Sequence, residues 1–390
     1  MATVTAGMRA IAVAGLVSLL GLAGCASAGE PTKTGGEARA VFTIAPDPYP
    51  DDAARFLAGM PGRAESPFKQ FEDEKQWLAH AAGFDAAFAR WNAGRRPPIA
   101  AFQKAELAGQ DLESATAFYP FGGPDVVHVM TFYPKNPEYI LVGLEPPGSL
   151  AKVGKLSETA LETQLPHVRR TLSDVLGRSF FITRQMDLQL RSGQVTDGLL
   201  PIMLVQLVRT QAKILGVAPV TLNDAGDVVA REPAAGQPNP GVAIDFQMPG
   251  ENTHRRLYYF SVNLGDEKFS ANTRFHNFLA RPAKMVSMFK STSYMPHRKD
   301  FSKIREVVMS RSLAVVQDDS GIPFQYYEPG RWDVALYGSY NTPYGSFRNL
   351  VQRDLQKAYS DPKKTKPLPF NIGYGFQRAP SNLLIARRRG

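Results

Sequence analysis

The spacing of apolar and polar residues changes along the chain. Between positions 72 and 93, apolar residues recur mostly every three or four positions and Gly94 follows them, which predicts an amphipathic helix. A second helix is expected after Pro97 and Pro98, so that the globular part begins with a helical hairpin. Three runs rich in β-branched and aromatic residues come next, separated by turn residues. We interpret these runs, at 115–121, 125–134 and 138–146, as a β-meander.

The middle of the chain has a helical pattern. Positions 157–215 predict helices, and the stretch 199–216 is apolar around most of its circumference, as expected for a helix buried in a protein core. Gln206 and Arg209 interrupt this stretch, which leaves it too short to span a bilayer. Turn residues at 223–227 then predict a hairpin.

The last third alternates between strand and helix patterns. We expect strands at 242–247, 256–264, 313–317, 332–337, 370–376 and 383–387. We expect helices at 273–279, 300–309 and 346–359. Strands alternating with single helices predict an α+β or mixed α/β fold, with a mixed sheet and covering helices. The Gly- and Pro-rich segment 233–241 is either a domain boundary or a long surface loop.

Composition and charge restrict the class of protein. Hydrophobic residues make up 44% of the 390 positions and aromatic residues 10%, which indicates a packed globule rather than a disordered chain. The formal net charge is +9, and apart from the run 387–389 the basic residues are scattered. Such a charge suits weak attraction to anionic lipids or acidic glycans. A nucleic-acid partner is not expected, because no basic stripe is interleaved with aromatic residues.

The first residues predict export and a lipid anchor. Positions 1–24 carry one charged residue, Arg9, followed by the apolar stretch 10–23, which is the layout of a secretory signal. The segment Leu22-Ala23-Gly24-Cys25 resembles the lipobox of bacterial lipoproteins. The resemblance implies cleavage before Cys25 and acyl chains on its sulfur, and several acyl chains together give stable membrane binding.

This resemblance sets the expected organisation and location of the chain. Positions 1–24 are the signal peptide, 25–40 a flexible tether and 41–390 the globular region. Because Ala26 is not the aspartate that tends to retain lipoproteins at the inner membrane, we expect attachment to the outer membrane, facing the periplasm. Cys25 is the only cysteine, so the globular region contains no disulfide.

Complete catalytic or metal-binding motifs are missing from the sequence. Six histidines occur without the spacing of a zinc site, so neither a metal ion nor a cofactor is expected. Asp125 and His128 are expected on a strand, where a separation of three points their side chains to opposite faces. The SxxK, SxN and KTG elements of penicillin-binding proteins are matched in part at 287–290, 339–341 and 364–366, but the third has lysine in place of glycine. We therefore do not favour that enzyme class.

Residues with functional chemistry concentrate in three later segments, 289–300, 317–327 and 337–347. The first contains Lys290 and His297, and the second places Asp318 and Asp319 directly after a predicted strand. Loops that follow strands of an α/β sheet gather at one edge, so these residues are candidates for a shared site. Either aspartate is a candidate general base, because neighbouring carboxylates can hold protons at different pKa values. Ordinary turn and capping chemistry also accounts for these segments, and the sequence leaves both interpretations open.

Two functions follow from the sequence. The first is a non-catalytic envelope lipoprotein that binds a protein, glycan or lipid partner and serves assembly or maintenance of the cell surface. The alternative is a periplasm-facing hydrolase that acts on an envelope glycan or another anionic substrate. Catalytic groups are often adjacent in space but separated in sequence, so a sequence without a complete motif does not exclude an enzyme.

Overall fold

Strands and helices alternate along the part of the chain that the computed structural model describes, which comprises residues 42–150, 157–179, 197–231, 240–340, 342–377 and 381–390. The strands are β1 (Thr116–Tyr119), β2 (Glu138–Gly143), β3 (Lys213–Leu222), β4 (Val228–Ala230), β5 (Gly241–Gln247), β6 (Arg255–Ser261), β7 (Met285–Phe289), β8 (Ser312–Gln317), β9 (Trp332–Gly338), β10 (Thr365–Lys366) and β11 (Asn382–Arg388). The α-helices are α1 (Tyr49–Leu57), α2 (Lys75–Arg90), α3 (Arg96–Glu106), α4 (Gln110–Glu113), α5 (Val126–Phe132), α6 (Glu158–Arg178), α8 (Leu200–Arg209), α9 (Asp266–Ala271), α10 (Thr273–Leu279), α11 (Ser302–Arg311) and α12 (Arg353–Tyr359). Shorter helical turns are η1 (Lys69–Phe71), η2 (Trp91–Arg95), η4 (Met295–His297), η5 (Lys299–Phe301), η6 (Phe324–Tyr326), η7 (Gly345–Leu350) and η8 (Gly373–Gln377).

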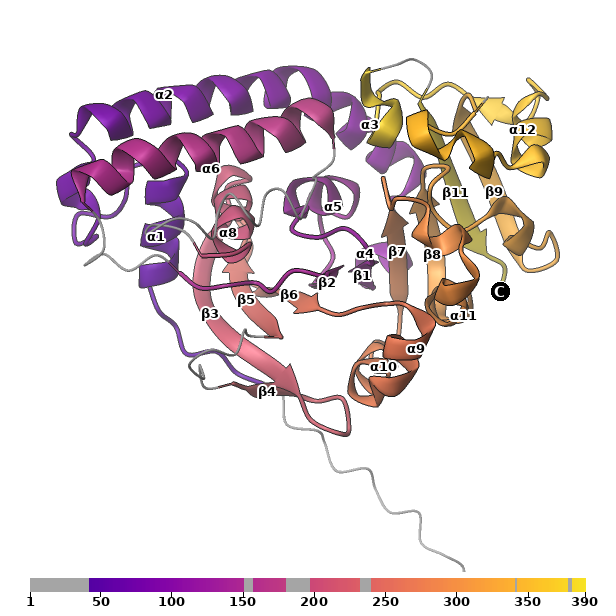
Figure 1. Cartoon of the computed structure of the whole chain (residues 1–390), viewed down its shortest axis with the longest axis horizontal. Coiled ribbons are helices and arrows are strands. Elements are labelled where there is room, and N and C mark those ends of the chain that lie inside the picture. The colour runs from indigo at the N-terminus through magenta and orange to yellow at the C-terminus, as the bar shows by residue number, and fades with distance from the viewer. Residues whose placement is uncertain (1–41, 151–156, 180–196, 232–239, 341, 378–380) are drawn as a thin grey trace, which may run out of the picture. The chain divides into compact units, whose positions relative to one another are not determined.

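One mixed sheet joins all the described strands, in the order β10-β9-β11-β8-β7-β1-β2-β6-β5-β3-β4. Its centre, β8-β7-β1-β2-β6, is parallel throughout (Figure 1). The chain moves outward from β1 to β2 and β6, and then returns to the other side of β1 to form β7 and β8. The strand order therefore reverses between β1 and β7. Sheets of this doubly wound kind form a crevice at that point, outside the carboxyl ends of the strands.

Two hydrophobic cores lie on opposite faces of the sheet. Alternate residues of a strand point to opposite faces, so Ala117 and Tyr119 of β1 belong to one core and Phe118 to the other. The first core includes apolar residues of α1, α2, α3, α5, α6 and α8. The second includes those of α9, α10, α11 and α12. The architecture is thus three layers, with helices on both faces of the sheet.

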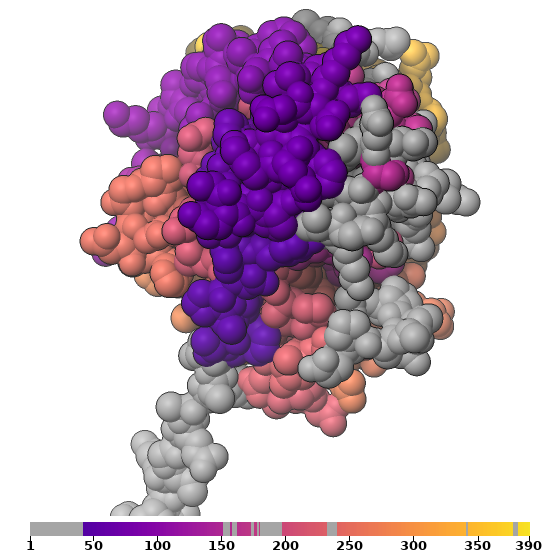
Figure 2. Space-filling view, turned by 90° about the vertical axis from the view of Figure 1, so that its left-hand side faces the viewer, coloured from indigo at the N-terminus to yellow at the C-terminus, as the bar shows by residue number. Residues whose placement is uncertain are grey.

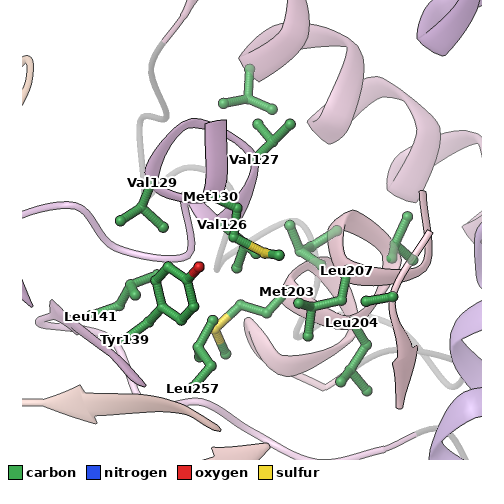
Figure 3. Packing of buried hydrophobic residues seen from close by; sticks show 14 of the residues in the cluster. Val126, Val127, Val129, Met130, Tyr139, Leu141, Met203, Leu204, Leu207 and Leu257 are labelled. Carbon is green, nitrogen blue, oxygen red and sulfur yellow. The ribbon is translucent and has the colours of Figure 1, made fainter. Parts of the chain in front are cut away.

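Helix α5 is the next element after β1, and it packs against α8 and β2. Figure 3 shows its apolar side chains beside those of α8 and of strand β2. Val126, Val127 and Val129 are fully buried, and the amide side chain of Gln206 accepts a hydrogen bond from the Val127 N–H at 3.0 Å. This packing fixes the first turn of α5 at the carboxyl edge of the sheet.

The first described residues cross the side of the molecule. Figure 2 shows them in indigo, beside the pink residues near positions 200–250. The Asp47 N–H donates to the Leu215 carbonyl at 2.9 Å, and the buried Asp51 carboxylate accepts from the Ile214 N–H at 2.9 Å. The segment before α1 is therefore joined to β3 through a main-chain hydrogen bond, and α1 itself through the side chain of Asp51.

Most expected elements are confirmed, and the fold is a mixed α and β structure with covering helices. The helices expected at 72–93 and after Pro98, the hairpin at 223–227, and the strands expected from 242 to 337 all have counterparts. However, α2 continues through the π-helical turn η2 into α3 without a hairpin loop, and α2 packs against α6. The run at 199–216 ends as a helix at Arg209 and begins a strand at Lys213.

The expected β-meander is wrong. Residues Val126–Phe132 form the helix α5, and β1 and β2 on either side of it are parallel rather than antiparallel. Parallel neighbours require a crossover, and α5 supplies it. Two later expectations also fail: 370–376 contains the helical turn η8 in place of a strand, and 346–359 is divided into η7 and α12.

Residues 42–390 form one compact unit. In the sequence, 233–241 follows β4 and reaches the start of β5, and both of these strands pair with β3 in the same sheet. Residues 232–239 lie outside the described residues. The predicted signal peptide, Cys25 and the tether also lie outside them. None of the helices in the described part of the chain is both long enough and apolar enough to span a membrane.

Candidate functional site

Three loops that follow parallel strands meet at the carboxyl edge of the sheet, where the strand order reverses between β1 and β7. Asp125 ends the loop after β1, Lys290 follows β7 directly, and Asp318 follows β8 directly. Because β1, β7 and β8 are parallel neighbours, these loops leave the same edge of the sheet (Figure 1). All three side chains are almost completely buried. Together with three further polar residues they form what we call the carboxyl-edge cluster: Tyr119, Asp125, His128, Ser179, Lys290 and Asp318.

Asp125 is the centre of the cluster. It is the N-cap residue of α5, and its Oδ1 atom accepts hydrogen bonds from the His128 N–H at 3.4 Å and from the His128 ring at 2.8 Å. Its Oδ2 atom accepts from the Tyr119 hydroxyl at 3.1 Å and lies 2.7 Å from Lys290 Nζ. Burial acts to raise the pKa of Asp125, but His128 and Lys290 outweigh burial and hold this pKa below its ordinary value. Asp125 is therefore ionised at neutral pH.

His128 connects Asp125 to a serine on another helix. Since Asp125 is an acceptor, His128 Nδ1 carries the proton and Nε2 has a free lone pair. Nε2 lies 3.3 Å from Ser179 Oγ, so the serine hydroxyl can donate to it. Burial lowers the pKa of His128, which keeps the ring neutral. The three side chains have the connectivity of an aspartate–histidine–serine triad.

Ser179 is held in a left-handed backbone conformation at the end of α6. Its φ is 67°, and its Oγ accepts a hydrogen bond from the Gly373 N–H at 3.3 Å. Its carbonyl oxygen accepts a hydrogen bond from Lys290 Nζ. Lys290 therefore contacts both Asp125 and the backbone of Ser179. Burial lowers the pKa of Lys290, and the carboxylate of Asp125 opposes this effect.

Two further acidic residues, Asp318 and Asp319, follow β8 at the same edge of the sheet as Asp125. Asp318 accepts from the N–H groups of Ser291 and Ser320 at 2.9 and 3.0 Å, and also from the Ser320 hydroxyl at 2.5 Å. Asp319 accepts from the Tyr294 hydroxyl at 2.5 Å. Burial, together with the neighbouring Asp319, raises the pKa of Asp318 to about 6. Asp318 therefore changes protonation state near neutral pH.

The turn η8 contacts both Ser179 and Asp318 through Gly373. Gly373, with φ of +60°, donates to Ser179 on one side and approaches Asp318 on the other. A Cβ atom at this position would come 2.2 Å from Asp318 Oδ2 and 3.3 Å from Ser291 Oγ. Glycine is therefore required here both by the backbone conformation and by the close approach.

Strained backbone conformations concentrate around the cluster. Non-glycine residues with positive φ include Phe121 after β1, Ser179 after α6, and Ser291, Ser293 and Tyr294 after β7. Such conformations cost free energy and are common at active sites and ligand clamps. In addition, the Oγ atom of Ser291 is buried and has no hydrogen-bond partner among the described residues.

The predicted site residues lie at this edge of the sheet, but their roles differ. Lys290 pairs with Asp125, while Asp318 and Asp319 accept hydrogen bonds within a turn. The His297 ring lies 3.1 Å from the Asp319 carbonyl oxygen, and burial lowers the pKa of His297 to about 4. Within this group, the side chains of Lys290, Asp318 and Asp319 therefore have separate partners, and His297 contacts the backbone of Asp319 rather than its carboxylate.

The partial SxxK match does not form a site. Ser287 lies on β7, fully buried, with its Oγ 2.7 Å from Ser312 Oγ. Lys290 lies three residues later and contacts Asp125 instead. Of the other two elements, Asn341 lies outside the described residues and 364–366 are at the edge strand β10.

The sequence did not predict the triad-like arrangement. Asp125 and His128 were expected on a strand with opposed side chains, but they are three residues apart at the first turn of α5 and share a hydrogen bond. An Asp-x-x-His pattern after a Gly-Gly-Pro turn is a usable helix-capping signal. Ser179 is 51 residues from His128, and no local pattern connects the two.

The site differs from a nucleotide-binding crevice. In dinucleotide-binding folds a phosphate sits at the helix that follows the first strand. Here the ionised Asp125 already occupies that helix end, and α5 has only seven residues. A phosphate at this position would meet a negative charge. Among the described residues, no three His, Cys, Asp or Glu side chains are grouped to hold a metal ion.

Comparison with known proteins finds no family model, no curated protein and no solved structure that matches the chain.

Proposed function

We propose that this protein is a hydrolase of the bacterial cell envelope, held to the membrane by acyl chains on Cys25. The observation that supports the activity is the chain of contacts from Asp125 through His128 to Ser179, at 2.8 and 3.3 Å. This arrangement gives a serine hydroxyl a neutral histidine as its base and gives the histidine a fixed tautomer. The lipobox resemblance at Leu22–Cys25 supports the location.

The proposed chemistry is acyl transfer to water. Ser179 Oγ attacks the carbonyl carbon of an ester or amide in an envelope component, and its proton passes to His128 Nε2. His128 then gives this proton to the leaving oxygen or nitrogen, which departs as an alcohol or amine. Water attacks the acyl-serine ester and gives one proton to the same nitrogen. The acid is released, and the proton returns to Ser179.

Asp125 and Lys290 have different roles in this scheme. Asp125 orients the ring of His128 and stabilises its protonated form. Lys290 shares the same carboxylate at 2.7 Å and so reduces the negative charge that the imidazolium experiences. Because Ser179 is 1% exposed, substrate entry requires a movement of the chain that covers it. Gly373 of η8 donates to Ser179 Oγ and so belongs to that cover.

Labelling with a fluorophosphonate tests the proposal directly. The full-length protein in native membranes should react with the probe, and Ser179→Ala should remove the labelling. His128→Gln should reduce it at least tenfold, because the serine loses its base. Ser310→Ala is the matched control, since Ser310 is an exposed serine whose hydroxyl donates to the Val307 carbonyl. Labelling that persists in Ser179→Ala, or a folded native protein that does not react, would contradict the hydrolase.

A second function, a non-catalytic binding or assembly lipoprotein, is supported by one observation. Both carboxylate oxygens of Asp125 already have partners within the protein, and these contacts are buried, as is common for a polar group that stabilises a core. For such a protein, Ser179→Ala and His128→Gln would lower the unfolding temperature without changing any labelling. Crosslinking in intact cells would then identify the protein, glycan or lipid partner.

The anchor is tested separately from the activity. The native mature protein should have a mass that corresponds to a chain starting at Cys25 plus acyl groups, and should fractionate with the outer membrane. Cys25→Ala should release the protein from the membrane, because one sulfur carries all the acyl chains. An unmodified Cys25 thiol in native membranes would refute the lipoprotein assignment while leaving the hydrolase test unaffected.

A further inference from the structure

A π-helical turn joins α2 to α3 beside the cluster. This turn, η2, spans Trp91–Arg95, and π-helical turns inside α-helices often occur at functional sites. Trp91 at its start packs edge-on against the ring of His128, with centroids 5.2 Å apart. Arg95 at its end places its guanidinium carbon 3.8 Å from the ring centre of Phe376. The turn η2 therefore contacts His128 through Trp91 and Phe376 through Arg95.

Arg95 has a charge without a carboxylate partner among the described residues. Other partly buried arginines form ion pairs, such as Arg256 with Asp245 at 2.6 Å and Arg209 with Asp85 at 2.6 Å. Arg95 has no such contact in the described chain, and its contact is the face of Phe376. Partial burial lowers the pKa of Arg95, which reflects the loss of water around its charge. An anion at this position would replace the lost water.

Two connections place Arg95 near the proposed nucleophile. Phe376 belongs to η8, and Gly373 of the same turn donates to Ser179 Oγ. Trp91, four residues before Arg95, contacts the ring whose Nε2 faces Ser179. The positive charge of Arg95 also contributes to the low pKa of His128, so the two groups are within electrostatic reach. The guanidinium, the histidine and the serine therefore belong to one neighbourhood.

We propose that Arg95 binds a carboxylate or phosphate group of the substrate that Ser179 attacks. This inference rests on the hydrolase proposed above and adds the substrate class: an anionic ester or amide. The planar guanidinium can donate two parallel hydrogen bonds to either anion. Phe376 holds the guanidinium in position through its ring face, which leaves the edges with the N–H donors for the anion. The same chemistry fits a small soluble anion and the headgroup of an anionic lipid.

Kinetics with a pair of esters tests this role. We expect Arg95→Gln to raise KM for the monoanionic p-nitrophenyl succinate at least tenfold, with little change in kcat. Hydrolysis of the neutral p-nitrophenyl acetate should change much less, because this ester has no anion for Arg95 to bind. Arg96→Gln is the matched control, because Arg96 is the next residue and is exposed. Arg95→Lys should recover part of the affinity, since a lysine keeps the charge but loses the planar fork. Equal effects of Arg95→Gln and Arg96→Gln on the anionic ester would overturn the inference and leave the hydrolase intact.

A binding measurement separates the anion site from the chemistry. In Ser179→Ala, which cannot form the acyl-serine, inorganic phosphate or succinate should still raise the unfolding temperature. The shift should disappear when Arg95→Gln is added, and it should persist with Arg96→Gln. If the native protein hydrolyses neither ester but this Arg95-dependent shift remains, the hydrolase fails and the anion site stands. No shift with either anion would refute the site.

Vesicles distinguish the two sources of the anion. The acylated protein already associates with lipid, so the soluble Cys25→Ala variant is used. Arg95-dependent binding to phosphatidylglycerol vesicles, over phosphatidylcholine vesicles, would assign the site to a lipid headgroup. Stabilisation by free phosphate or succinate without such binding would assign it to a soluble anion. Vesicle binding that Arg95→Gln and Arg96→Gln reduce equally would exclude the lipid headgroup.

Discussion

Two loops at the carboxyl edge of the sheet each contain a buried aspartate, but the surroundings of the two carboxylates differ. Asp125, after β1, lies 2.7 Å from Lys290 Nζ, and its pKa is held below the ordinary value although burial alone would raise it. Asp318, after β8, receives N–H and hydroxyl hydrogens from Ser291 and Ser320, and burial raises its pKa to about 6. Hydrogen bonds alone do not offset the loss of water around a carboxylate as fully as a buried cation does.

This difference separates a fixed charge from a titrating one. Asp125 remains ionised across the physiological pH range and can orient His128 throughout it. Asp318 gains or loses a proton near neutral pH, and Asp319 beside it is the main neighbouring charge that favours the protonated form. The predictions below test the two aspartates against each other.

The largest effect should come from removing the cation of the first loop. Lys290→Met leaves Asp125 buried without its counter-ion, and breaking a buried ion pair in this way costs about 3–5 kcal/mol. Urea unfolding at pH 7 measures the loss. Lys303→Met is the control, because Lys303 lies 3.7 Å from Glu306 on the exposed face of α11 and such pairs contribute about 0–1 kcal/mol.

A double variant shows whether the unpaired charge is the cause. In Asp125→Asn with Lys290→Met both charges are gone, so part of the stability should return relative to Lys290→Met alone. If Lys290→Met costs no more than Lys303→Met, then Asp125 is not fixed by this ion pair and the contrast between the two loops is lost.

The second prediction concerns pH. The folded-state pKa of Asp318 is raised from 3.8 to about 6, so between these values the native state binds a proton more tightly than the unfolded chain does. The Asp318 contribution to stability is therefore complete below pH 4 and is lost as the pH rises to 6. Burial also lowers the pKa values of His80 and His297 to about 4. Comparing wild type with Asp318→Asn removes these two contributions, which are the same in both proteins, and leaves the contribution of Asp318 together with its coupling to Asp319. The free energy of unfolding of wild type relative to the variant should fall by on the order of 2 kcal/mol from pH 4 to 6. A constant or rising difference would show that the pKa of Asp318 is not raised.

The sequence could predict a site residue only where its position depends on neighbouring residues in the chain rather than on tertiary contacts. Asp318 and Asp319 were predicted as candidates because they follow an apolar strand pattern, and the position after a strand is a local property. Lys290 was predicted because basic and hydroxyl residues concentrate in 289–300, and the strand β7 that it follows was not expected. The run beginning at Asp125 was expected to be a strand because valines dominate it. In the structure, the cap by Asp125 and burial against α8 and β2 favour a helix over that local preference.

The remaining site residues have no local signal. Ser179 meets His128 only because α6 ends above the carboxyl edge, and Gly373 meets both Ser179 and Asp318 through a turn far along the chain. The segment around Gly373 was expected to be a strand, since its apolar residues Phe370 and Ile372 alternate. Contacts of this kind follow from tertiary packing, which single-sequence patterns do not contain.

Gly373 gives a third, smaller test, because it borders both loops. Gly373→Ala combines a φ of +60° with a Cβ atom 2.2 Å from Asp318 Oδ2, and we expect a loss of about 2 kcal/mol. Gly345→Ala is matched in backbone, with φ of +46°, but no atom lies within 4 Å of its Cβ position, so it should cost about 1 kcal/mol. Chemical denaturation of both variants measures the difference, which is the cost of displacing η8 from Asp318. Equal losses would mean that η8 moves away freely.

The smallest effects distinguish the two carboxylates through the tyrosine that donates to each. Tyr119→Phe removes a hydrogen bond to Asp125 and should cost about 1 kcal/mol, equally at pH 5, 6.5 and 8, because Asp125 is ionised at all three. Tyr294→Phe removes a hydrogen bond that favours the ionised form of Asp319, whose pKa burial raises. Its cost should therefore grow as the pH rises and Asp319 loses its proton. Urea unfolding of the two variants at the three pH values measures this divergence. If the two variants lose the same free energy of unfolding at all three pH values, then Asp125 and Asp319 hold the same charge. The two loops would then differ in the ion pair with Lys290 but not in the protonation state of their aspartates.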